Sequence, residues 1–208
     1  MIKMNIHKAL STKKLLDKRI EKGTDNLIPV GYKMKSSATE YRTKEEVDRF
    51  NKETSASYIQ VKTLIENYNK ICRAITLSNA TTKVEINGKE MTVSDAINRK
   101  NNIEYEEDLL RRLKYEYSRV LEKVKERNDL LESKIDNLRE VDKKEKIDKQ
   151  SSYDLMRENE SWELIDPLDI KKVISDMEDD ILKFKSEVDF ALSTSNAQTI
   201  IEVDIDEV

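Results

Sequence analysis

Apolar residues recur at helical spacing along most of the chain, and the clearest pattern lies near its C-terminal end. There the steps between apolar positions alternate between four and three residues, at Ile170, Ile174, Met177, Ile181, Phe184, Val188 and Ala191. This heptad spacing places these side chains along one face of a helix. Asp166 and Pro167 come just before the pattern and form a residue pair typical of a helix N-terminus. The sequence therefore predicts a helix over residues 167–195.

A second heptad pattern occupies the middle of the chain and predicts a long helix over residues 93–140. Its apolar positions recur every seven residues, at Ile103, Leu110, Tyr117, Val124, Leu131 and Leu138. A sustained heptad of this kind is typical of coiled coils, in which the apolar seam needs a partner helix. A helix of this length spans about 60–70 Å at about 1.5 Å per residue.

Two further helices are predicted in the first third of the chain. Residues 2–22 place apolar side chains at near-helical spacing, and Gly23 follows them as a residue suited to the left-handed end of a helix. Residues 44–77 form the next helix. It is preceded by Thr43 and carries Glu46 three residues later, the sequence of a capping box.

The remaining segments predict short β-structure and connections. Residues 83–91 alternate around Asn87-Gly88, a strong type I′ turn signal, and so predict a β-hairpin. Residues 27–34 contain Pro and Gly and are expected to be an extended edge segment, and residues 199–205 are a β-capable tail. Residues 140–152 are dense in charge and predict a flexible connection, and residues 153–165 are expected to be irregular.

These elements predict a mostly α fold within a single helical domain over residues 1–208. The expected architecture is an elongated helical bundle with long heptad-bearing helices, a small β-hairpin and short edge strands. The composition is also typical of long, solvated helices, because 38% of residues are charged, 37% are hydrophobic, and only 3 Gly and 2 Pro occur. Ordinary globular chains carry only about 25% charged residues. Heptad faces on such helices need partners, so we expect a homo-oligomer.

Charge is distributed unevenly along the chain. Residues 1–35 carry 9 basic and 3 acidic side chains, a net +6, whereas residues 153–208 carry 5 basic and 16 acidic side chains, a net −11. The basic start could lie beside the acidic end and set the register of an assembly. Alternatively, both segments are simply solvated faces. A net charge of −4 disfavours nucleic-acid binding, which needs a clustered cationic face.

The chain offers little catalytic chemistry. It has 1 His and 1 Cys, too few for a zinc cluster or a disulfide framework, and we expect His7 to bind no metal and Cys72 to fill the core. Three scattered glycines build no phosphate loop. The side chains of the acidic run Asp176–Asp180 point in several directions around a helix and do not converge on one cation, so we expect them to be solvated. Trp162 is expected to anchor packing. The sequence therefore predicts no catalytic residues, metal or cofactor.

Cationic and aromatic residues in helix 93–140 suggest a ligand site. Arg111 and Arg112 lie near Tyr115, and in an oligomer such residues from several chains could converge on an anionic or nucleotide ligand. The alternative is local pairing with acidic residues at helical spacing. Arg99, Lys100 and Asn79 form a further candidate patch, because the hairpin should bring the end of one helix beside the start of the next. The alternative there is that Asn79 ends its helix and Arg99 pairs with Asp95.

Two segments carry a resemblance to a known family. Residues 79–82 and 92–100, NATT and TVSDAINRK, are similar to a block of the septicolysin-like family of bacterial and phage proteins, and residues 189–196 with the strand at 199–203 give a second match. The order of helix, hairpin, long helix, late helix and terminal strand is similar too. Two positions depart from the family pattern: Asn101 stands where an acidic residue is usual, and Ala197 where Trp is usual. The family has no established activity.

Together these observations predict a non-enzymatic, homo-oligomeric binding protein. On this interpretation it holds a partner or sequesters a small anionic, nucleotide-like ligand between chains. It is expected to be cytoplasmic, in the host cytoplasm if it is phage-encoded. One alternative is a structural or assembly component of a virion or tail. A hydrolase that uses carboxylates is the other. The sequence shows no apolar run of membrane-spanning length and no secretory signal, so no membrane partner is expected.

Overall fold

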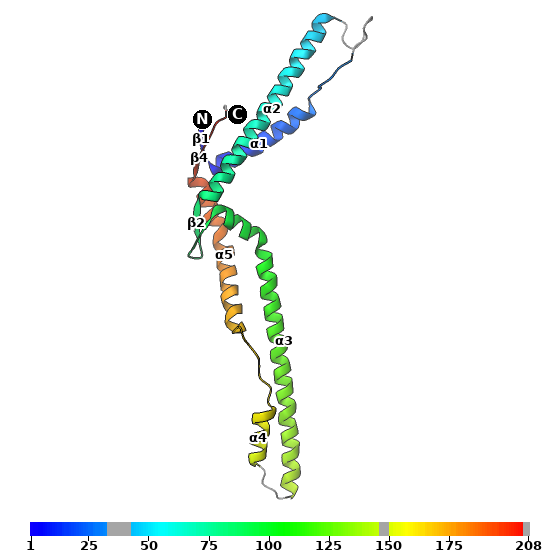
Figure 1. The fold of residues 1–208 in the computed structure, drawn as a ribbon, viewed down its shortest axis with the longest axis vertical. Helices are drawn as coiled ribbons and strands as arrows, with labels where there is room; N and C mark the ends of the chain where they lie inside the picture. Colours follow the sequence, from blue (N-terminus) through cyan, green and yellow to red (C-terminus); the bar gives the residue numbers. More distant parts are fainter. Residues whose placement is uncertain (33–42, 146–149, 206–208) are drawn as a thin grey trace. The chain divides into compact units, whose positions relative to one another are not determined.

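The computed structural model describes residues 1–32, 43–145 and 150–205 and shows a mostly helical chain (Figure 1). Helices make up 79% of the structure, and a β-hairpin accompanies them, as the sequence predicts. The chain forms two compact units, Met1–Arg99 with Glu187–Val208, and Lys100–Ser186. The sequence gives no sign of this division, because both of its boundaries fall inside continuous helices.

The first unit is built on an antiparallel helix pair. Helix α1 spans Ile6–Asp25 and α2 spans Lys44–Thr81. The capping box predicted at Thr43 is confirmed: the Glu46 amide donates to the Thr43 hydroxyl at 3.2 Å, and the Thr43 amide donates to the Glu46 carboxylate at 2.9 Å. These bonds satisfy two amides that would otherwise lack partners at the helix start.

Strands from the two ends of the chain complete this unit. Strand β1, Ile2–Asn5, pairs antiparallel with β4, Ile200–Val203, in the register Ile2↔Val203. The prediction of a helix from residue 2 is therefore wrong for its first four residues. Asn5 ends the strand and caps α1, since its side chain accepts the Lys8 amide at 2.9 Å. The β-structure predicted for residues 199–205 is confirmed over β4.

Apolar side chains from both strands and both helices meet in one core. Its buried members are Met4, Ile6, Ala9, Leu16, Ile71, Ile75, Ile201, Val203 and Ile205. Pairing of β1 with β4 therefore ties the beginning of the chain to its end around a shared core. Burial of the larger aliphatic side chains of this core contributes on the order of 1.5–3 kcal/mol for each one that is fully buried.

Gly23 corrects a second prediction about α1. It lies inside the helix, which continues to Asp25 and ends at Asn26 in the right-handed region. A Cβ at Gly23 would stand 2.9 Å from Val61 Cγ2 of α2. The glycine therefore serves close approach of the two helices, whereas the sequence suggested a left-handed helix end. Residues 27–32 form no strand, contrary to the predicted edge segment, and Thr54 donates to the Ile28 carbonyl at 3.2 Å. Residues 33–34 of that segment lie outside the described residues.

The predicted β-hairpin is confirmed by strands β2, Lys83–Ile86, and β3, Lys89–Thr92. Its turn has positive φ at both central residues, 53° at Asn87 and 67° at Gly88, as a type I′ turn requires. The Asn87 amide also donates to the Glu187 carboxylate at 2.6 Å. At the base of the hairpin, the Val93 amide donates to the Thr82 carbonyl at 2.9 Å, so the end of α2 and the start of the next helix are neighbours.

The second unit contains parts of two long helices and one short helix. Helix α3 runs over Val93–Glu145, longer than predicted, and α5 over Ile170–Gln198. The Asp166 carboxylate stabilises the start of α5, because it accepts hydrogen bonds from the amides of Leu168, at 3.2 Å, and Ile170, at 2.9–3.0 Å. The helix begins three residues later than Pro167 suggested, because Pro167 and Leu168 form a turn and Asp169 follows them with a φ of +52°.

Helix α4, Gln150–Glu160, is an element that the sequence did not predict. Residues 153–165 were expected to be irregular, but Tyr153 is buried against Leu131 and Ile135 of α3, with Met156 packed beside them. The helix is therefore stabilised by contacts far along the chain, which a short apolar pattern does not reveal. Of the predicted flexible connection, residues 140–145 belong to α3 and 150–152 to α4, and 146–149 lie outside the described residues.

Candidate functional site

The second unit contains a groove between α3 and α5 with a volume of about 590 Å³. It is lined by Glu107, Leu110, Arg111 and Lys114 of α3 and by Glu178, Ile181, Leu182 and Lys185 of α5. On each helix these residues follow the spacing i, i+3, i+4, i+7, which places them on one face. The groove is thus formed by matched faces of two helices.

Charged residues at the ends of the groove join the two helices crosswise. Lys185 Nζ lies 2.7 Å from Glu107 Oε1, and Lys114 Nζ lies 2.7 Å from Glu178 Oε1. On each helix, Glu is the first of the four lining residues and Lys, seven positions later, is the last. Because the helices run antiparallel, each Glu meets the Lys of the other helix. All four side chains are at least one-third exposed, so each pair contributes at most about 1 kcal/mol and chiefly fixes register.

Between the two ion pairs the groove is lined by three apolar side chains, Leu110, Ile181 and Leu182, and by one charged residue, Arg111. Ile181 is buried at 6% exposure, Leu110 is half-buried, and Leu182 remains 67% exposed. None of the eight lining side chains is an imidazole, a thiol or a hydroxyl, so this groove offers no nucleophile. Its chemistry suits the burial of apolar side chains between charges of both signs.

The predicted ligand residues of α3 are divided between this groove and local pairs. Arg111 lines the groove and also pairs with Asp108 at 2.6 Å. Arg112 pairs with Glu116 at 2.6 Å, and its guanidinium lies 5.7 Å from the centre of the exposed Tyr115 ring. Arg112 and Tyr115 are not among the groove residues. The alternative of local pairing at helical spacing is therefore confirmed for both arginines.

The other predicted residues lie near the hairpin or just after it. Asn79 is half-buried in the last turn of α2, and Arg99 is half-buried in α3, both in the first unit. Lys100 is exposed and is the first residue of the second unit. The backbone bond between Val93 and Thr82 bears out the expectation that the two helix ends are neighbours. A ligand role for these three residues stays a prediction.

Sequence reasoning missed the pairing of Glu107 and Glu178 with lysines of the other helix. From the sequence, the acidic residues of segment 93–140 are predicted only to pair locally, the run Asp176–Asp180 is predicted to be a solvated face, and no role is predicted for Lys185. The signal that could have found them is the repeated pattern of Glu, an apolar residue three positions on, and Lys after seven, in two heptad helices. Comparing the charge pattern of the two heptads would have predicted an antiparallel pair.

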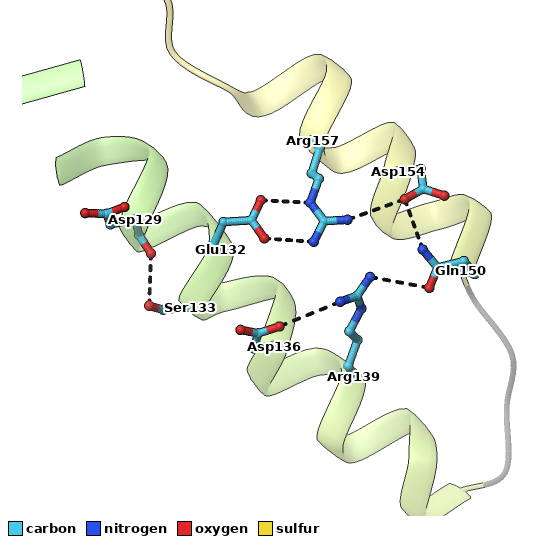
Figure 2. Close-up of polar contacts among 8 residues, drawn as sticks. All are labelled: Asp129, Glu132, Ser133, Asp136, Arg139, Gln150, Asp154 and Arg157. Carbon is cyan, nitrogen blue, oxygen red and sulfur yellow. Dashed lines mark hydrogen bonds and ion pairs between the residues drawn. The ribbon is translucent and has the colours of Figure 1, made fainter. Parts of the chain in front are cut away.

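A second polar cluster fastens α4 to α3 (Figure 2). Arg157 donates to both carboxylate oxygens of Glu132, at 2.8 and 2.7 Å, and also pairs with Asp154. The Arg157 hydrogen bond is the main reason why the pKa of Glu132 lies below its ordinary value. A buried hydrogen bond from the Tyr153 hydroxyl to Asp142 adds to the contact. These residues hold one helix of the chain against another, which is a structural role.

Two predictions about individual side chains require correction. Trp162 is 54% exposed, so its ring is not the expected packing anchor. The ring centre lies 5.2 Å from the Arg127 guanidinium at the surface. The backbone is held as well, because the Trp162 amide donates to Asn128 Oδ1 at 2.7 Å and its carbonyl accepts from Asn128 Nδ2 at 2.9 Å. Cys72 is a free thiol that is half-buried, which is less than the core position expected for it.

The described residues contain neither a metal-binding cluster nor a helix suited to span a membrane. Residues 1–32, 43–145 and 150–205 contain no group of three or more His, Cys, Asp or Glu side chains placed to hold a metal ion. Among the helices of the same residues, none combines the length and the apolar character needed to cross a membrane.

No family model, curated protein or solved structure matches the chain. The resemblance to the septicolysin-like family therefore stays a prediction that rests on the residues quoted for it. The interpretation of this protein's function rests on its own geometry.

Proposed function

We propose that this protein is a non-enzymatic binding protein that associates with a second copy of itself through the α3/α5 groove. The observation that supports this most directly is the exposed apolar centre of the groove, with Leu182 at 67% exposure, between two ion pairs of opposite direction. An apolar side chain of a partner placed there would bury Leu182 and complete the heptad seam.

The charge pattern of the groove favours a second copy as the occupant. The two ion pairs within the chain show which helix face is complementary to α3 or to α5: one that presents Glu and Lys one heptad apart in the antiparallel direction, and a second copy could exchange these pairs for equivalent ones. The chain itself carries this pattern twice, over residues 107–114 and 178–185. A two-fold dimer places the same patch on both subunits, so an internally complementary pattern is suited to it.

The experiment compares two leucines of equal exposure. Leu182, 67% exposed, lines the groove, whereas Leu130, 65% exposed, lies elsewhere on the surface of α3. Leu182→Asp should raise the dimer dissociation constant by about 100-fold or more, because burying an unpaired carboxylate costs several kcal/mol. Leu130→Asp introduces the same charge on an exposed helical position and should leave the constant within about threefold.

Sedimentation velocity over a range of micromolar concentrations measures both constants, and circular dichroism confirms that both variants remain helical. A closed dimer that Leu182→Asp dissociates supports the proposal. A monomeric native protein would contradict it, and so would equal effects of the two substitutions. A series of ever larger species would favour the alternative of a structural or assembly component.

A further inference from the structure

A second pocket, between α1 and α2 in the first unit, differs from the groove in its charge. It has a volume of about 380 Å³ and is called here the α1/α2 pocket. Its lining consists of Arg19, Lys22, Gly23 and Asn26 of α1 and Ser57, Gln60, Val61 and Leu64 of α2. Both sets follow the spacing i, i+3, i+4, i+7, so one face of each helix supplies the walls.

The floor of the pocket is apolar and closely packed. Val61 is buried at 9% exposure, and a Cβ on Gly23 would stand only 2.9 Å from its Cγ2 atom. Gly23 therefore lets the helices approach each other, while the longer side chains around it form the walls. The result is a small recess beside a close helix–helix contact.

The walls of the α1/α2 pocket are cationic and carry no carboxylate. Arg19 and Lys22 bring positive charge, while Asn26, Ser57 and Gln60 add neutral hydrogen-bonding groups. Within the described part of the chain, neither Arg19 nor Lys22 forms an ion pair. In the α3/α5 groove, by contrast, Lys114 and Lys185 are both paired with glutamates. Like charges three residues apart on a helix repel each other, so an anion between them is stabilising.

Two of the last carbonyls of α1 are bonded within the chain, which lessens the negative charge that this helix end presents to the pocket. Helix C-termini carry partial negative charge on their last carbonyls. Here the Lys22 carbonyl accepts from the Asn26 amide at 3.2 Å and from Asn26 Nδ2 at 2.8 Å, and the Thr24 carbonyl accepts from the Leu27 amide. These carbonyls are therefore occupied by donors of the chain itself. The Asn26 amide group still has a second N–H to donate.

We propose that the α1/α2 pocket binds the phosphate end of a small organic phosphate such as a nucleoside diphosphate. The Arg19 guanidinium matches the forked geometry of phosphate oxygens, and Lys22 supplies a second charge. Ser57 and Gln60 offer neutral donors on the opposite wall, and the floor of Gly23, Val61 and Leu64 suits a less polar part of the ligand. A volume of about 380 Å³ lies within the range of small-molecule sites. This site is separate from the proposed dimer groove and does not depend on it.

Isothermal titration calorimetry of the full chain with pyrophosphate, ADP and adenosine tests the proposal. Pyrophosphate and ADP should both bind, ADP more tightly, and adenosine should bind least. Arg19→Gln with Lys22→Gln should weaken ADP binding at least about tenfold, the loss expected when charge-assisted hydrogen bonds to phosphate are removed. Lys14→Gln with Lys18→Gln removes the same charge from exposed positions of α1 outside the pocket and should change affinity less than about threefold.

A third variant, Ser57→Leu, fills the pocket without changing any charge and should also weaken ADP binding at least about tenfold. It keeps the test decisive if the double substitution of Arg19 and Lys22 unfolds the unit. The absence of ADP and pyrophosphate binding to the native protein would overturn the proposal. Equal losses in the two glutamine pairs would also overturn it, because they would show attraction to the basic segment as a whole.

Discussion

Single residues set how closely the helices of the first unit approach, and Gly23 shows this most clearly. The same residue type serves a different purpose at position 88, where φ is +67° and a Cβ would meet nothing within 4 Å. Gly88 is therefore required by the backbone of the turn, and Gly23 by the space beside Val61. The sequence indicates the first requirement, because Asn-Gly between alternating residues is a turn signal. It cannot indicate the second, which depends on a residue of another helix.

The close contact between Gly23 and Val61 predicts that the effect of Gly23→Ala on the free energy of unfolding depends on the residue at position 61. In an exposed helix interior, Gly→Ala stabilises by about 1 kcal/mol. Gly23→Ala should instead destabilise the protein, because the new Cβ meets Val61 Cγ2 at 2.9 Å and a β-branched side chain is stiff. In a Val61→Ala background the same substitution should be neutral or stabilising.

Urea unfolding measures the free energy of unfolding of the four proteins in this cycle. A coupling energy near zero would contradict the close contact between Gly23 and Val61. Gly88→Ala is a useful control, since its cost arises from the positive φ and should not depend on the residue at position 61.

At the scale of elements, the sequence predicted those whose signals are local and missed those that depend on distant contacts. The hairpin at 83–92 and the capping box at Thr43 follow from a few adjacent residues, and both are confirmed. Strand β1 was mistaken for helix, because its partner β4 lies at the other end of the chain. Helix α4 was missed because Tyr153 and Arg157 acquire their partners from α3.

For the candidate site, too, the sequence predicts the apolar helix faces but not the contacts between helices. The heptad faces of α3 and α5 follow from apolar spacing, and Arg111, a predicted ligand residue, lines the groove between them. The crosswise ion pairs of the groove depend on the alignment of two helices that are far apart in sequence. The α1/α2 pocket depends in the same way on how residue 23 meets residue 61, and no local motif marks it.

The contact between α3 and α4 predicts a measurable pKa. The carboxyl of Glu132 accepts two hydrogen bonds from Arg157, which lowers its pKa below the ordinary value. Arg157→Gln should therefore raise the pKa of Glu132 towards that value, as carboxyl-resolved NMR titration would show. Arg139→Gln should raise it less, because Arg139 lowers this pKa only as the weakest of its causes. Equal shifts in both variants would contradict the dominance of the Arg157 bond.

The direction of the pH dependence follows from the same bond. A carboxyl whose pKa is lower in the folded protein stabilises the fold above its unfolded pKa, and this stabilisation is lost as the pH falls through the folded value. Amide hydrogen exchange in α4 should therefore become faster, relative to α1, when the pH is lowered through this range. The Arg157→Gln variant should show a smaller pH-dependent difference, because it lacks the bond at every pH.

At the scale of the whole chain, the uneven charge has a partial explanation in the first unit. The basic start lies beside the acidic end, where β1 and β4 bring Lys3 within 2.8 Å of Glu202. Lys70 also donates to the Asp204 carbonyl at 2.8 Å. The juxtaposition that was one of the two interpretations of the uneven charge therefore occurs within one chain, between Lys3 and Glu202. Much of the remaining positive charge of the first 35 residues lies on α1, where Arg19 and Lys22 line the cationic pocket.

The two proposed interactions should respond differently to salt, because different forces stabilise them. Raising NaCl from about 0.05 M to about 0.5 M shortens the Debye length from about 14 Å to about 4 Å. Binding of pyrophosphate to Arg19 and Lys22 is electrostatic and should weaken at least about tenfold over this range. Dimerisation through the apolar centre of the α3/α5 groove should change less than about threefold, since the charges at its ends are paired and of both signs.

Calorimetry and sedimentation velocity on the same samples measure the two dissociation constants. Sodium sulfate at equal ionic strength separates screening from competition, because a divalent anion that occupies the pocket should weaken pyrophosphate binding further than chloride does. Dimerisation should instead be unchanged or strengthened by sulfate, which favours burial of apolar surface. A dimer that dissociates steeply with either salt would show that charge, and not Leu182 and its apolar neighbours, joins the two copies.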